Sequence, residues 1–279
     1  MVLFFYLLIF VFGTTVGSFI GVIVDRLSSK EPIWKGRSHC DHCRHTLHAF
    51  DLIPLISFFL LKGKCRYCHK RLSWFYPLVE FSTGIAYLAI GIALLQQPTY
   101  LIGQFAYQLV FLYYFLLIGA LVTIFFADVR YGIIPFKFVT FAFLVTLVWD
   151  IVFPFLPLSP YIRQFLGFQT NISNIIISAV GAGGFFFLLF AITKGRGMGF
   201  GDVVYACLMG FTLGFPRVIL GLYIAFVTGA IISLILIALK KKKFNGGTIP
   251  FGPFLVFGTI ISLLWGDVAI AYLMRFLNF

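Results

Sequence analysis

Two kinds of residue in this sequence have the spacing that chemistry requires: paired cysteines and isolated aspartates. Cys40 and Cys43 form one Cys-x-x-Cys pair, and Cys65 and Cys68 form a second. Two residues between cysteines let both thiolates face one ion from a tight turn, and two such pairs complete a tetrahedral Zn²⁺ site. Because four thiolates leave no position for a water ligand, the sequence predicts a structural zinc site.

Two other arrangements of this segment remain open. The pairs could form two disulfides, although stable disulfides are rare in the cytoplasm, where we place the segment below. One histidine could also replace a cysteine as a ligand. All five histidines lie here: His39, His42, His45, His48 and His69. The fifth cysteine, Cys207, lies in an apolar run, and we expect it to be a small core residue.

Asp128 and Asp202 are the acidic residues best placed for chemistry. Asp128 ends one apolar run, and Asp202 opens another in Gly199-Phe200-Gly201-Asp202. An aspartate at the centre of a membrane costs roughly 2.5–3.5 kcal/mol, so such residues are functional candidates. Two carboxylates that share one proton can activate a water and protonate a carbonyl oxygen, which are the steps of peptide hydrolysis. Alternatively, Asp202 only caps its helix, and Asp128 pairs with Arg130 or Arg196.

The chain around these residues is too apolar for a soluble domain. Of its 279 residues, 61% are hydrophobic and 11% are charged, whereas soluble domains have ~45–50% apolar residues and about a quarter charged ones. The apolar runs are continuous, unlike the alternating strands of a membrane β-barrel, and several reach the ~20 residues that a bilayer requires. We therefore expect an all-α polytopic membrane protein with about eight transmembrane helices. The expected spans are 3–24, 77–95, 105–126, 136–153, 172–192, 203–215, 218–239 and 254–276.

The basic residues predict the orientation of these spans. With the N-terminus outside, all but three of the 21 Lys and Arg residues fall in inside segments, which leaves Arg163, Arg217 and Arg275 outside. The positive-inside rule thus predicts that both termini are outside. Two spans separate Asp128 from Asp202, so both aspartates are expected at the cytoplasmic face.

The same orientation divides the chain into three expected segments. These are a first transmembrane helix (1–24), a cytoplasmic zinc-binding loop domain (25–76) and a membrane-embedded domain (77–279). No basic residue precedes Arg26, so the first helix is expected to stay in the protein instead of being cleaved as a signal peptide. The net charge of +12 reflects topology and not nucleic-acid binding. The four lysines at 240–243 are expected to contact anionic lipid.

Six motifs in this chain resemble, in order, those of the type IV prepilin peptidases, which are polytopic aspartyl proteases of the GxGD kind. The first five motifs are Gly17-Ser18-Phe19 with Val24-Asp25-Arg26-Leu27, the cysteine pairs with Asp51-Leu52-Ile53-Pro54, Tyr76-Pro77-Leu78-Val79-Glu80, Asp128 with Ile134-Pro135, and Gly199-Phe200-Gly201-Asp202. The sixth is Ile249-Pro250-Phe251-Gly252-Pro253-Phe254. The family often has Asp or Asn after the Ile-Pro, whereas this chain has Phe136. Asp128 is therefore the only carboxylate in its neighbourhood.

The resemblance implies a bacterial inner-membrane enzyme whose active site faces the cytoplasm. Such an enzyme removes the short basic leader of type IV prepilins or pseudopilins for pilus biogenesis, type II secretion or competence, with Asp128 and Asp202 as its catalytic residues. The resemblance also implies N-methylation of the new N-terminus with S-adenosylmethionine. No Gly-rich methyltransferase loop is evident, so Glu80 and Gly84, together with residues 17–27 and the cysteine segment, are only candidates for the donor site.

Two competing functions are consistent with parts of the pattern. A presenilin-like intramembrane protease shares the Gly-x-Gly-Asp tetrad, but nothing in that family looks like the cysteine segment. A transporter could use the acidic residues as an ion path. Transport favours acids near the bilayer midplane and broken helices in paired repeats, whereas Asp128 and Asp202 lie at the ends of their runs.

Overall fold

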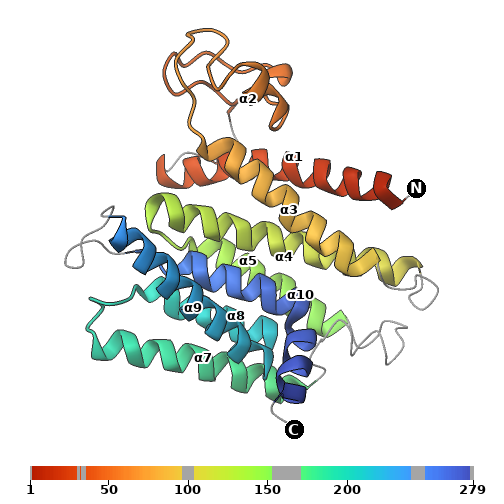
Figure 1. The fold of residues 1–279 in the computed structure, drawn as a ribbon, viewed down its shortest axis with the longest axis vertical. Coiled ribbons are helices and arrows are strands. Elements are labelled where there is room, and N and C mark those ends of the chain that lie inside the picture. Colours follow the sequence, from red (N-terminus) through yellow and green to blue (C-terminus); the bar gives the residue numbers. More distant parts are fainter. Residues whose placement is uncertain are drawn as a thin grey trace. The chain divides into compact units, whose positions relative to one another are not determined.

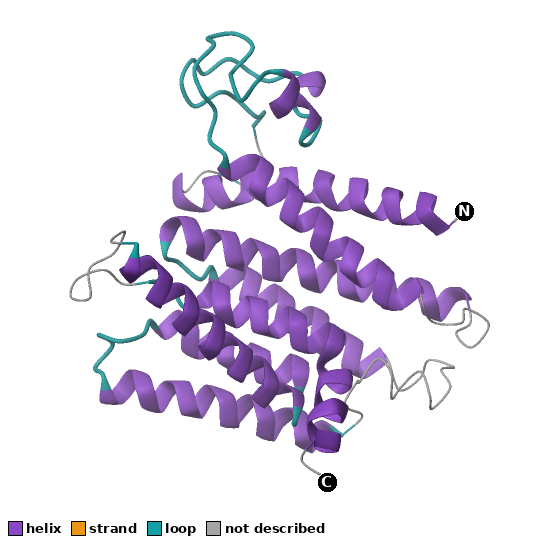
Figure 2. Cartoon of the chain, in the orientation of Figure 1, coloured by secondary structure: helices purple, strands orange, loops and turns teal. Residues whose placement is uncertain are grey.

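The computed structural model describes residues 2–29, 32, 36–95, 104–152, 171–239 and 249–276, and every regular element in these ranges is helical (Figures 1 and 2). The chain divides into two compact units, Met1–Gln97 and Pro98–Phe279. The lysine run at 240–243 and Arg163, both used in the topology prediction, lie outside the described residues.

The long helices match the eight predicted apolar runs closely. The first unit contains α1 (Val2–Ser29), the 3₁₀ turn η1 (Ala49–Asp51), α2 (Ile56–Leu60) and α3 (Phe75–Leu95). The second unit contains α4 (Gln104–Tyr131), α5 (Phe136–Val152), α7 (Ile172–Ile192), α8 (Phe200–Leu213), α9 (Arg217–Ala238) and α10 (Gly252–Phe276). Among the described residues, six helices are long and apolar enough to cross a membrane: α1, α3, α4, α7, α9 and α10. Helices α5 and α8 are shorter, with 17 and 14 residues.

In the first unit, α1 packs against α3 (Figure 1), and glycines lie at their contact. A Cβ on Gly13 would lie 2.9 Å from the Cα of Gly84, and one on Gly17 would lie 2.7 Å from the Cα of Glu80. Such small-residue contacts let membrane helices approach closely, so that van der Waals packing holds them together. This packing fixes Ser18, on α1, close to Glu80, on α3.

The second unit uses the same kind of contact twice. A Cβ on Gly210 of α8 would overlap the carbonyl oxygen of Ser178 on α7, and one on Gly258 of α10 would overlap the carbonyl oxygen of Gly221 on α9. Helix α10 also packs on α4 and α8. The result is that the first turns of α8 and α10 come close to the last turn of α4.

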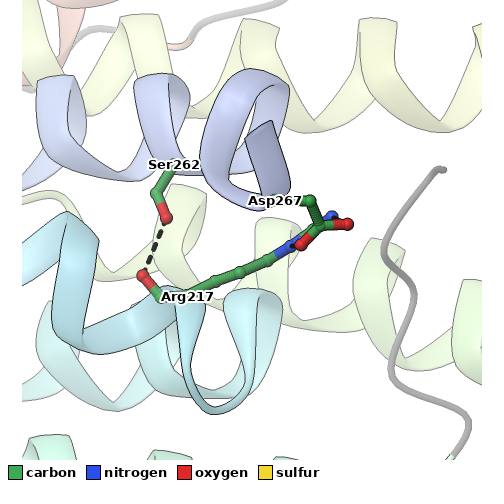
Figure 3. A network of polar contacts seen from close by, with 3 residues as sticks. All are labelled: Arg217, Ser262 and Asp267. Atoms are coloured by element: carbon green, nitrogen blue, oxygen red, sulfur yellow. Dashed lines mark hydrogen bonds and ion pairs between the residues drawn. The ribbon is translucent and has the colours of Figure 1, made fainter. Parts of the chain in front are cut away.

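An ion pair between a buried arginine and an exposed aspartate joins α9 to α10 (Figure 3). Arg217, the first residue of α9, is only 4% exposed, and its Nε lies 2.6 Å from Oδ1 of Asp267. The Ser262 hydroxyl donates to the carbonyl oxygen of Arg217 at 2.7 Å (Figure 3). A charge removed from water is stabilised only by such a partner, so this contact fixes how α9 and α10 lie against each other.

Candidate active site and cysteine cluster

Asp128 lies in the last turn of α4 and is almost completely buried, with 4% of its surface exposed. The helix ends three residues later because Gly132 adopts a φ of +64°, and its N–H closes the last turn on the carbonyl oxygen of Asp128 at 2.8 Å. The Gly252 amide, at the start of α10, donates to the Asp128 carboxylate. The first N–H groups of a helix have no partner within the helix, and Asp128 supplies one.

Asp202 is the third residue of α8 and is 7% exposed. Its Oδ2 accepts the backbone N–H of Gly199 at 3.1 Å. Asp202 therefore caps its own helix, which was the alternative role considered for it in the sequence analysis. This bond orients the carboxylate and leaves its other oxygen available to a further partner.

The two carboxylates belong to one cluster within the second unit. The side chain of Ile134 lies between Gly201 and Gly252. A Cβ added to Gly201 would be 3.0 Å from Cβ of Ile134, and a Cβ added to Gly252 would be 3.1 Å from Cδ1 of Ile134. Gly252 in turn lies against the Asp128 carboxylate, and Gly201 directly precedes Asp202. The charge of Asp202 acts on Asp128, so the two acidic groups interact through space. Among the described residues, Asp128 forms no ion pair with Arg130 or Arg196.

The four cysteines also come together, in the first unit. We name the described residues 36–74 the cysteine loop. The Sγ atoms of Cys40, Cys43, Cys65 and Cys68 all lie within 4.8 Å of one another, and none of them forms a disulfide. Tetrahedral Zn–S bonds of ~2.3 Å require sulfurs about 3.8 Å apart, and the Cys40–Cys68 Sγ distance is 3.9 Å. The donor set and its spacing therefore fit a Zn²⁺ ion.

Each cysteine pair has the same backbone geometry. The N–H of Cys40 donates to the carbonyl of His45 at 3.0 Å, and the N–H of Cys65 donates to that of Lys70 at 2.9 Å. The residue after each second cysteine, Arg44 or His69, has a positive φ of 58° or 56°. The two pairs are thus structural copies, 25 residues apart. The sequence analysis missed this repeat, although Cys-x-x-Cys followed four residues later by Leu occurs in both pairs.

The surroundings of Cys65 favour the thiolate that a metal needs. Burial alone would raise the pKa of its thiol, but hydrogen bonds from the backbone N–H groups of Cys68 and Tyr67, and from the thiols of Cys40 and Cys68, lower the pKa below its usual value. Amide donors to sulfur leave less charge for the metal to neutralise. The rings of His45 and Tyr67 lie against each other at a tilt, with centroids 3.7 Å apart.

The fifth cysteine, Cys207, does not belong to this cluster. We expected it to be a core residue, but it is exposed on α8.

Three aspartates hold the cysteine loop in shape. Asp51 forms an ion pair with Arg66 at 2.7 Å and accepts the Tyr67 hydroxyl at 2.9 Å. The hydroxyl of Tyr76, in the first turn of α3, lies 2.7 Å from Oδ2 of Asp25 and 3.2 Å from Oδ2 of Asp41. The contacts of Asp51 fix the segment between the two cysteine pairs to the second pair, and those of Tyr76 fix the loop to the ends of α1 and α3.

Glu80 and Gly84, the predicted candidates for a methyl-donor site, lie on α3 in the first unit. Glu80 is 8% exposed. Its Oε2 accepts the backbone N–H of Leu55 at 2.7 Å, and the Ser18 hydroxyl also donates to it. A Cβ on Gly84 would lie 2.7 Å from the Phe10 ring, so Gly84 serves the contact between α1 and α3.

Comparison with known proteins matches both units. Residues 11–94 match the bacterial Peptidase A24 N-terminal domain, and residues 115–234 match the type IV leader peptidase family. The prepilin leader peptidase/N-methyltransferase of Bacillus subtilis is 28% identical over 270 residues, covering 96% of this chain and 97% of the relative. Those of Aeromonas hydrophila and Pseudomonas aeruginosa are also 28% identical, covering 97% and 96% of this chain and 94% and 92% of the relatives. No solved structure matches the chain significantly.

Proposed function

We propose, from the premise that this chain belongs to the type IV prepilin leader peptidase family, that Asp128 and Asp202 are the catalytic residues of its peptidase activity. The chain is an aspartic prepilin peptidase, and its full-length relatives are named as bifunctional with N-methyltransferase activity. The observation that carries the proposal is the meeting of two buried carboxylates from α4 and α8, beside the first residue of α10.

This geometry supports an acid–base mechanism. Two carboxylates close together in a partly desolvated site share one proton more easily than they carry two charges. The ionised carboxylate takes a proton from a water as the water attacks the scissile carbonyl carbon, and the protonated one donates to the carbonyl oxygen. The Gly252 and Gly199 amides hold one oxygen of each carboxylate, so the site is oriented before substrate binds.

We also propose that all eight long helices cross the bacterial inner membrane, with both termini outside and both aspartates at the cytoplasmic face. At 1.5 Å per residue, α5 and α8 span about 25 and 21 Å, which is less than the ~30 Å hydrocarbon core. A short α8 would place Asp202 slightly below the cytoplasmic membrane surface. A substrate whose hydrophobic helix stays in the bilayer would present its basic leader there.

The cysteine loop completes the proposal. A Zn²⁺ bound by its four cysteines would act structurally, because four thiolates fill the coordination shell. The exposed basic residues of the cytoplasmic segments, with the lysines at 240–243, would contact anionic lipid headgroups. S-adenosylmethionine would donate the methyl group to the new N-terminus, as the names of the relatives suggest.

Processing of a purified prepilin tests this function. The protein in lipid nanodiscs, incubated with a prepilin or competence pseudopilin and S-adenosylmethionine, should release the leader and leave a product heavier by one methylene group. Mass spectrometry of the product checks both steps. An uncut prepilin would contradict the peptidase assignment, and a cut but unmethylated product would contradict only the methyl transfer.

A further inference from the structure

Residues 52–61 of the cysteine loop form an apolar run, Leu-Ile-Pro-Leu-Ile-Ser-Phe-Phe-Leu-Leu, in which Ser57 has the only polar side chain. An apolar run of about 10–14 residues is too short to cross a bilayer and is typical of a buried core helix or of a re-entrant or interfacial membrane segment. A buried core helix does not fit this run, because Ile56, Phe59 and Leu60 of α2 are 57%, 60% and 76% exposed.

The ends of α1 and α3 show where the polar surface of the membrane lies beside this run. The Tyr76 hydroxyl, in the first turn of α3, is 2.7 Å from Oδ2 of Asp25 on α1, so these two residues are at one level. Asp25 is the first charged residue of α1, and the exposed Trp74 directly precedes α3. Tryptophan and tyrosine are enriched at the membrane–water interface, which therefore lies close to this level.

The apolar run contacts α1 and α3 at a deeper level. Its Leu55 N–H donates to Oε2 of Glu80 on α3 at 2.7 Å, and the Ser18 hydroxyl of α1 donates to the same carboxylate. Ser18 is seven residues before Asp25, which is about 10 Å along α1. Glu80 is four residues after Tyr76, which is about 6 Å along α3. The run thus folds back along the two helices instead of extending beyond their ends (Figure 1).

The backbone of the run is hydrogen-bonded in the way that this depth requires, since the bilayer core offers no water as a partner. The chain turns at Leu55, which has a φ of +60°, and the N–H of Ile56 donates to the carbonyl of Pro54 at 2.6 Å. Further bonds within the run join the N–H groups of Ser57, Phe59 and Leu61 to the carbonyls of Ile53, Leu55 and Ser57. For the Leu55 N–H the acceptor is Glu80, which gives this acidic residue of α3 a role in holding the turn.

The surroundings of the run favour lipid as the partner of its exposed face. Phe19, a partly exposed residue of α1, lines one cavity together with Leu52 and Pro54, so the run is continuous with the outer surface of a proposed membrane span. Lys62 and Lys64, both exposed, follow the run directly. Lysines at the end of a membrane segment extend their ammonium groups to the headgroups while their apolar stems stay in the interface.

We propose that residues 52–61 form a re-entrant segment in the cytoplasmic leaflet of the membrane, with Ile56, Phe59 and Leu60 against the acyl chains and Glu80 holding the turn at which the segment reverses. The proposal rests on α1 and α3 crossing the membrane as proposed above. The segment anchors the cysteine loop to the membrane surface at which the leader is expected to be cut.

Photo-labelling of the full-length protein in nanodiscs tests this placement. One sample contains phosphatidylcholine and phosphatidylglycerol with a diazirine at the middle of the acyl chains, and a second sample in ordinary lipid receives a water-soluble diazirine. Peptide mass spectrometry should find lipid adducts on residues 56–60 at a level at least about tenfold above that on the exposed residues 41–46 of the same loop. The water-soluble reagent should give the reverse pattern.

A matched pair of variants tests the contact itself. Because a charge within the leaflet is costly, Leu60→Asp should reduce the lipid adducts on residues 56–60 at least about fivefold, whereas Leu60→Ala should keep them within about twofold. Equal labelling of the two variants would overturn the contact assigned to Leu60.

The labelling pattern of the wild-type protein also identifies other partners. Labelling of residues 56–60 by the water-soluble reagent would show that the run faces water, and labelling by neither reagent would show that protein covers it; either result overturns the proposal. Lipid adducts on residues 3–12 report the α1 span separately, and their absence would contradict the membrane topology as well. Leader cleavage by the same preparation is an independent reading, so a failed insertion with normal cleavage leaves the proposed function standing.

Discussion

At the scale of single residues, the peptidase site depends on a glycine as much as on its two acids. Gly252 begins α10, and its amide donates to the Asp128 carboxylate. A Cβ at this position would lie 2.5 Å from Oδ2 of Asp128, which is closer than real contacts allow. The carboxylate can be both buried and hydrogen-bonded to the helix start only because residue 252 has no side chain.

The Gly252→Ala variant should therefore cleave prepilin at least about tenfold more slowly, because the added methyl displaces the Asp128 carboxylate from its amide donor. Its matched control is Gly184→Ala on α7, where an added Cβ would meet nothing within 4 Å and alanine favours the helix by ~1 kcal/mol. Initial cleavage rates, with amounts of folded protein equalised by size-exclusion chromatography, give the comparison. Equal rates for the two variants would show that Gly252 does not constrain Asp128.

At the scale of elements, the cysteine loop consists of two copies of one turn, whose four cysteines form a single cluster. Asp51, which lies between the two turns, binds Arg66 and Tyr67 of the second turn, but no large apolar core holds the turns together. Phe50, Ile56, Phe59 and Leu60 in this region are all more than half exposed. We therefore expect the loop to need the proposed zinc ion for folding.

Metal analysis of the purified protein should give about one Zn²⁺ per chain, and the double variant Cys40→Ser, Cys43→Ser should lose it, because removal of one turn leaves two ligands. Cys207→Ser, which changes a cysteine outside the cluster, should keep the full metal content. Two disulfides and no metal in the wild-type protein would refute the zinc site.

At the scale of the whole molecule, the peptidase proposal requires α5 and α8 to cross the membrane despite their length. If only the six longer helices crossed, the start of α8 would lie on the opposite side from the end of α4. Asp202 and Asp128 would then face different compartments, which their contact through Ile134 does not permit.

Reporter fusions distinguish these two topologies. A green fluorescent protein fused after Gly195, between α7 and α8, should fluoresce, because that loop is expected in the cytoplasm with Lys194 and Arg196. Alkaline phosphatase fused after Asn171 should be active, because the start of α7 is expected outside. Active alkaline phosphatase after Gly195 would contradict the eight-span topology.

Hydropathy was enough to predict the position of every long helix, because each apolar run is continuous and bounded by polar residues. Cys-x-x-Cys spacing likewise predicted the cluster of four cysteines. The contacts between distant segments could not be predicted. Asp267 pairs with Arg217, 50 residues away on another helix, and no pattern in the sequence connects these two residues. The contact of Gly252 with Asp128 and the hydrogen bonds of Glu80 also depend on how helices pack, which no local pattern specifies.

The most direct test of the aspartyl mechanism is the cleavage rate of Asp128→Asn and Asp202→Asn across the pH range. Asparagine keeps the shape and a hydrogen bond but can neither accept the water's proton nor supply one. Each variant should fall below detection, a loss of at least about a hundredfold. The wild-type rate should decline at both acid and alkaline pH, because one carboxyl must be ionised while the other keeps its proton. The control is Asp150→Asn, which makes the same change near the C-terminal end of α5, the end opposite the proposed active site. This variant should cleave normally. Near wild-type cleavage by either active-site variant would show that the two aspartates are not the catalytic pair.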